Sequence, residues 1–133
     1  MNLVEKLIRI DKDKVREKET KKIKSSRLSK LLGEETEITI RELGGRRFSG
    51  IATMAITEDG KTDFSKMYDV NLMYCAEGII DPPVRDGSLM EHFGAKTPKD
   101  LVEILFGPEA AEISDEIVGL SKITRESEKE VKN

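Results

Sequence analysis

Apolar and polar residues alternate over one stretch of the chain, from residue 37 to residue 43. This period of two is typical of a strand with one buried face, and such a strand needs a partner. The nearest candidate is the segment from Thr20 to Ser25, centred on Ile23. A turn of helix at residues 28–32, ended by Gly33, would join the two strands. The pattern therefore predicts a small antiparallel hairpin.

Beyond residue 44 the apolar residues recur instead at the three- and four-residue spacing of helices. The longest such stretch extends from Phe64 to Ile79, and its apolar face is wide enough to form the centre of a core. Thr97-Pro98-Lys99-Asp100 is a strong helix start, and Gly107-Pro108 separates that helix from a last one. The predicted fold class is α+β and predominantly α, with the hairpin followed by four to five short helices packed in one domain.

The first ten residues form a short amphipathic segment that Asn2 can cap as a helix of about two turns. Its apolar face consists of Leu3, Val4, Leu7 and Ile8. Helices this short are marginal alone, so the face must pack on its own domain or on a partner, and the pattern leaves both open. The predicted organisation is a short helix and charged linker over 1–19, one globular α+β domain over 20–123, and a flexible polar tail over 124–133.

Composition allows one hydrophobic core and not two, since 37% of the 133 residues are hydrophobic and 37% are charged. No apolar run is long enough to span a membrane, so we expect a cytoplasmic protein without a membrane partner. Charge is uneven, because residues 1–33 hold 11 Lys and Arg against 5 acids, and residues 34–133 hold 12 against 21. A basic arm for an acidic partner and a solvated linker both give this asymmetry.

Residues that carry chemistry are scarce. Cys75 is the only cysteine and His92 the only histidine, so a nucleophilic Cys-His pair requires the fold to bring these two together, and Cys75 falls on the apolar face of the central helix. No glycine-rich phosphate-binding motif is present. Arg46 and Arg47 after Gly44-Gly45 offer two guanidinium groups to an anion, or are solvated in a turn. We therefore predict no catalytic residues, no metal ligands and no cofactor.

Five segments between Thr20 and Ile123 occur in an order that is similar to one known family. They are Arg27–Gly33 before the strand Glu37–Leu43, then Cys75–Pro82, then Leu89–Pro98, and finally Leu105–Ala110. Together they resemble the XkdN-like tail assembly chaperones of phages and prophages of Gram-positive bacteria. Two features depart from the family pattern, namely Pro108 between Gly107 and Glu109 and the basic N-terminal segment.

The resemblance implies a non-enzymatic protein that binds the tape measure protein, keeps it soluble and is displaced as the tail tube assembles. It also implies action in the bacterial host cytoplasm and absence from the mature virion. Further implied partners are the tail tube protein and a longer, frameshifted form of the chain itself, and homo-oligomers are left open. For the partner-binding surface we choose residues on the N-terminal helix and the arginine turn: Leu3, Leu7, Ile8, Arg46 and Arg47.

The alternative function is that of a small regulatory or nucleic-acid-binding protein using residues 12–30, which hold 9 Lys and Arg against 3 acids. Such a protein would bind with a steep salt dependence. The acidic remainder of the chain and the lack of interleaved aromatic and basic residues argue against this class.

Overall fold

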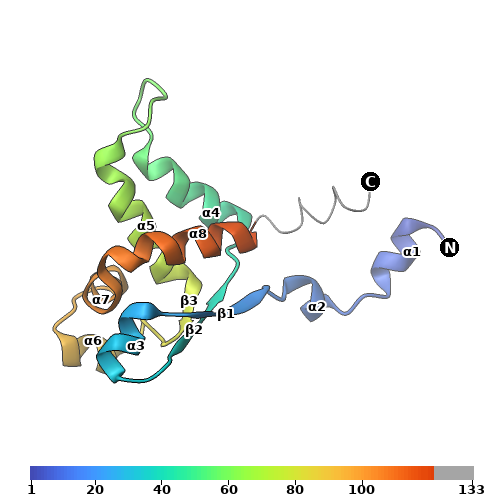
Figure 1. Cartoon of the computed structure of the whole chain (residues 1–133). Coiled ribbons are helices and arrows are strands. Elements are labelled where there is room, and N and C mark those ends of the chain that lie inside the picture. The colour runs from blue at the N-terminus through green and yellow to red at the C-terminus, as the bar shows by residue number, and fades with distance from the viewer. Residues whose placement is uncertain (122–133) are drawn as a thin grey trace.

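The computed structural model describes residues 1–121 (Figure 1). The polar tail predicted at 124–133 lies outside the described residues. In chain order the elements are α1 (Leu3–Ile8), α2 (Lys12–Arg16), β1 (Thr20–Lys24), α3 (Ser26–Leu32), β2 (Glu37–Arg41), α4 (Gly45–Ala52), the 3₁₀ turns η1 (Thr53–Ala55) and η2 (Phe64–Lys66), α5 (Met67–Gly78), β3 (Ile79–Asp81), α6 (Gly87–Phe93), α7 (Pro98–Phe106), η3 (Gly107–Glu109) and α8 (Ala110–Ser121). The α+β, predominantly α prediction is confirmed.

The sheet contains the predicted hairpin and one additional strand. β1 and β2 pair antiparallel with Ile23 opposite Ile38, and α3 connects them, ending at Gly33 with φ of 73°. β3 pairs antiparallel on the other side of β2, which gives the order β1-β2-β3. The third strand was not predicted, because three residues are too few to establish a period of two along the sequence.

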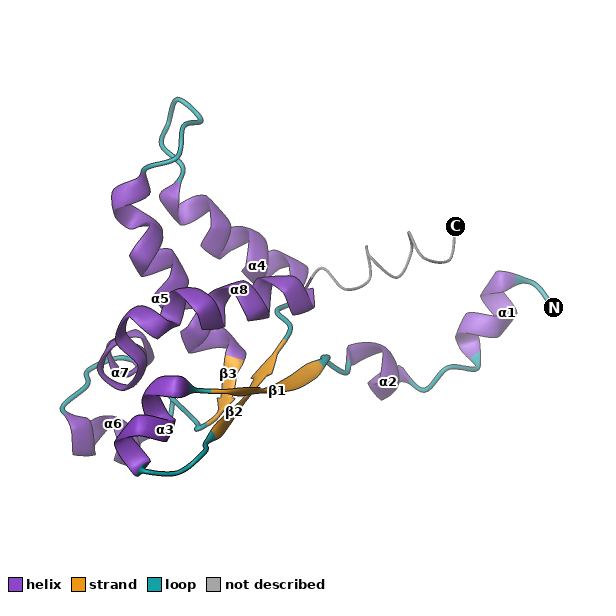
Figure 2. Cartoon of the chain, in the orientation of Figure 1, coloured by secondary structure: helices purple, strands orange, loops and turns teal. Residues whose placement is uncertain are grey.

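The core lies between α5 and the elements that surround it, which are α4, α7, α8 and the sheet (Figure 2). α8 packs along α5 and also against β2. Each of these elements contributes side chains that are fully or almost fully buried. They are Ile38 and Ile40 of β2, Ile51 of α4, Cys75 of α5, Leu101, Val102 and Phe106 of α7, and Ile117 of α8. The long helical stretch predicted as the centre of the core therefore does occupy it.

The start of that stretch differs from the prediction. Phe64 lies in η2 and is 80% exposed, and Tyr68 in the first turn of α5 is 40% exposed. This end of α5, together with the turn that connects it to α4, projects away from the sheet and α7 (Figure 1). Helical spacing places a residue on a face of the helix, but it does not say how far along the helix its neighbours reach.

The N-terminal arm, which we define as residues 1–19, leads away from the body of the molecule (Figure 2). Asp11 caps α2, a short helix within the stretch that the sequence suggested was a charged linker. Every residue from 1 to 22 is exposed, and neither α1 nor α2 has a buried residue. No helix among residues 1–121 is long and apolar enough to cross a membrane.

Candidate partner-binding surfaces

The apolar face of α1 is open to solvent. The Asn2 side chain accepts a hydrogen bond of 2.9 Å from the Glu5 N–H, as expected of an N-cap. The side chains predicted to form the face range from 56% to 77% exposed; they are Leu3, Val4, Leu7 and Ile8. No residue of α1 is buried against the body of the molecule, so its apolar face is available to another molecule.

Arg46 and Arg47 do not act as a pair. Both lie in the first turn of α4, but only Arg47 reaches the body, where its Nη2 donates to Oε1 of Glu77 at 2.9 Å. Arg46 is exposed and forms no ion pair with the residues described. Consecutive residues of a helix point in different directions, which separates the two guanidinium groups.

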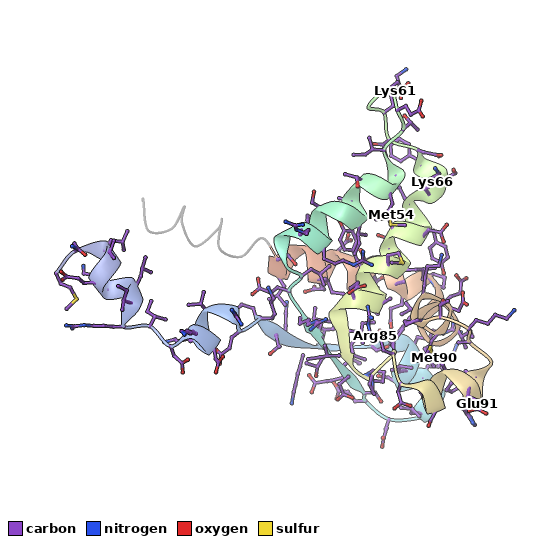
Figure 3. All side chains as sticks on the ribbon, turned by 180° about the vertical axis from the view of Figure 1, so that it is seen from behind. Met54, Lys61, Lys66, Arg85, Met90 and Glu91 are labelled. Atoms are coloured by element: carbon purple, nitrogen blue, oxygen red, sulfur yellow. The ribbon has the colours of Figure 1, made fainter. Side chains whose placement is uncertain are left out.

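Glu77 instead brings Arg47 together with an arginine that the sequence analysis did not select. Arg85, in the loop between β3 and α6, places its Nη2 2.7 Å from the same Oε1. Arg41 of β2 donates from Nε to the backbone oxygen of Glu77 at 3.2 Å. We call Arg41, Arg47, Arg85 and Glu77 the arginine cluster; Figure 3 labels Arg85. No local sequence signal marks it, since its members come from four separate segments.

Burial and charge act against each other on Glu77. Its side chain is 16% exposed, and burial alone would raise the pKa of its carboxyl group. Hydrogen bonds and charge from Arg47 and Arg85 outweigh burial, so the pKa lies below its usual value. The carboxylate is thus ionised at neutral pH and holds the two guanidinium groups, whose side chains are 50% and 58% exposed.

A groove of about 290 Å³ adjoins the arginine cluster between α5 and the start of α7. We call it the α5–α7 groove. Apolar atoms form part of its lining, and two cationic side chains, Arg85 and Lys99, stand beside them. The full lining consists of Met73, Ala76, Glu77, Arg85, Thr97, Pro98 and Lys99. Thr97 caps α7 by accepting from the Asp100 N–H, as the sequence predicted.

The nucleophilic pair considered from sequence is not assembled. Cys75 is buried, its thiol donates to the Ala110 carbonyl at 3.3 Å, and burial raises its pKa to about 12. His92 is exposed on α6 and packs edge-on against Phe93, with ring centroids 4.8 Å apart. Over residues 1–121 there is no group of three or more His, Cys, Asp or Glu residues arranged to hold a metal.

The basic residues between 12 and 30 are divided among α2, β1 and α3, except for Lys18, which lies between α2 and β1. One of them, Lys21, forms an ion pair of 2.7 Å with Glu116 of α8. Both side chains of this pair are about half exposed, so the bridge ties β1 to α8 weakly. The basic segment is therefore split between the N-terminal arm and the body, and part of its charge is already paired.

Comparison with known proteins complements this geometry. The sequence model of one family, described as phage XkdN-like tail assembly chaperone protein, matches residues 4–133. No curated protein and no solved structure matches the chain. The family match begins within α1, at Val4, and includes every later element among the described residues. The chain belongs to the XkdN-like family of phage tail assembly chaperones.

Proposed function

We propose that this chaperone binds the tape measure protein through the apolar face of α1 and keeps it soluble until tail tube subunits displace the chaperone. In this role it performs no catalysis. It acts in the cytoplasm of the bacterial host and leaves before the virion is complete. The tail tube protein is then a competitor for the same client, and a longer form of the chain would present the same α1.

The single observation that carries the proposal is the exposure of α1. Four aliphatic side chains lie on one face of six helical residues, and none is buried. Burying an aliphatic side chain of this size contributes roughly 1.5–3 kcal/mol, so a partner that covers the face gains several times that amount. A helix of the client, with its own apolar stripe, matches the i, i+4 spacing of Leu3 and Leu7.

Three exposed aliphatic residues of α2 and α3 do not reproduce this four-residue face. Val15 of α2 is the only aliphatic residue in its helix, and Leu31 and Leu32 of α3 are adjacent in sequence. These three residues are 62–72% exposed, which matches the range found in α1. They are therefore suitable controls, because they carry the same chemistry without the same arrangement.

The test is co-expression with the tape measure protein, followed by size-exclusion chromatography of the soluble fraction. A wild-type and a variant chaperone with different tags are expressed together, and mass spectrometry gives their ratio in the complex. For Leu7→Ser with Ile8→Ser, the variant should be depleted at least about tenfold, because roughly 1.4 kcal/mol or more of apolar contact is lost. Leu31→Ser with Leu32→Ser should stay near its input ratio.

Circular dichroism and thermal melting of the free variants accompany this measurement. We expect the melting temperature of the α1 variant to be unchanged, since Leu7 and Ile8 have no buried contacts to lose. Equal incorporation of the α1 variant and the wild type would refute the role of α1. If the tape measure protein stays insoluble with wild-type chaperone, the proposed client is wrong altogether.

A further inference from the structure

The arginine cluster contains more positive charge than its own structure uses. Arg47 and Arg85 contact the Glu77 carboxylate and Arg41 contacts the Glu77 backbone oxygen, so three positive charges meet one negative charge and the cluster has a net charge of +2. Arg47 and Arg85 both approach Oε1 of Glu77, each through a single nitrogen. A guanidinium group has five N–H donors, and these two side chains are half exposed, so both arginines retain donors for another acceptor. Glu77 thus positions two arginines side by side for a second carboxylate.

The α5–α7 groove provides an apolar surface beside these donors. Met73, Ala76 and Pro98 contribute to its lining, and Arg85 belongs both to the groove and to the arginine cluster. Lys99 adds a further cation, which contacts Asp69 only at 3.6 Å. A ligand that occupies the groove therefore meets an apolar surface and at least two cationic side chains together.

This cationic site stands out because of the charge around it. From residue 20 onward, outside the N-terminal arm, the chain holds 17 Lys and Arg against 21 acids, so the body of the molecule has a net negative charge. An acidic partner is repelled by this net charge and attracted at the arginine cluster. Electrostatic complementarity of this kind mainly supplies the register and specificity of binding.

We propose that the arginine cluster and the α5–α7 groove bind an acidic segment of the client, placing a carboxylate on Arg47 and Arg85 and an adjacent apolar side chain in the groove. This inference rests on the proposed function, and it adds a second contact on the body of the chaperone to the one made by α1. If the arginines are purely structural, they only neutralise Glu77 and the C-terminal end of α5.

Two substitutions with opposite expected effects distinguish these readings. Arg47→Gln with Arg85→Gln removes the donors, and in the two-tag competition for the tape measure protein it should be depleted roughly tenfold. Glu77→Gln keeps an oxygen acceptor that can position the two arginines but removes the competing negative charge, so this variant should be enriched about two- to threefold. A purely structural role predicts no enrichment. Arg46→Gln is the matched control, because it removes an exposed arginine of the same helical turn that makes no contact with Glu77.

The double variant leaves the Glu77 carboxylate without its two arginine partners, which destabilises the fold. A triple variant that combines Glu77→Gln, Arg47→Gln and Arg85→Gln controls for this effect. This triple variant leaves no unpaired buried carboxylate, and it should be as depleted as the double variant. Raising the salt concentration should weaken the wild-type complex more than that of the triple variant. Wild-type incorporation of the triple variant, or equal depletion of the Arg46→Gln control, overturns the inference while α1 binding stands. Failure of wild-type chaperone to hold the client overturns both proposals.

Discussion

At the scale of the residue, Gly78 shows how closely the core is packed. It is the last residue of α5, and a Cβ atom at this position would lie 2.6–2.9 Å from three side-chain carbons of Ile117. Ile117 is fully buried in α8, so its side chain lies against other core residues and not against solvent. Glycine is a poor helix former, and α5 ends at this residue. The stronger requirement for glycine, however, comes from the approach of α8.

We therefore expect Gly78→Ala to destabilise the protein by about 1–3 kcal/mol through overpacking, although alanine is the better helix former. Gly119→Ala in α8 is the control, because nothing lies within 4 Å of the added carbon. That variant should be neutral or slightly more stable. Urea denaturation gives both free energies of unfolding. A double-mutant cycle that combines Gly78→Ala with Ile117→Ala should show strong coupling between the two positions. Additive changes in the free energy of unfolding would contradict the proposed clash.

At the scale of the element, the N-terminus of α3 is fixed by a residue that is distant in sequence. Glu109 of η3 accepts from the Ser25 hydroxyl at 2.5 Å and from the Arg27 N–H at 3.0 Å. Ser25 is buried and also caps α3 by accepting from the Leu28 N–H. A carboxylate at this position also suits the positive end of the helix. This interaction joins the hairpin to the segment between α7 and α8.

Glu109→Gln should lower the free energy of unfolding by about 1–2 kcal/mol, because the amide loses one acceptor and places an NH₂ group against a donor. Glu112→Gln is the matched control, since Glu112 is exposed in the first turn of α8. Denaturant titration at constant pH compares the two variants. Equal free energies of unfolding for the two variants would show that the hydrogen bonds of Glu109 contribute nothing to stability.

At the scale of the whole molecule, Cys75 reports on opening of the core. Its side chain is fully buried, and its pKa of about 12 keeps the thiol protonated at neutral pH. A protonated, inaccessible thiol reacts only when the packing around α5 opens, so reactivity measures the population of open molecules.

Iodoacetamide should therefore label the native protein slowly and the urea-unfolded protein rapidly, as followed by mass spectrometry. The labelling rate of the native protein should rise with urea concentration in parallel with unfolding. Gly78→Ala should also increase this labelling rate. Cys75→Ser provides the unlabelled control. Rapid labelling under native conditions would instead revive the nucleophilic pair considered from the sequence.

The amino-acid sequence by itself determined the features that depend on near neighbours in the chain. These include the Thr97 cap of α7, the αL turn at Gly33 and the alternation of β2, because their energetics lie within a few residues. Only the tertiary structure decided the third strand, the exposure of Phe64 and the arginine cluster. Each of these depends on which segments pack together, and a periodic pattern specifies a face without naming the surface that covers it.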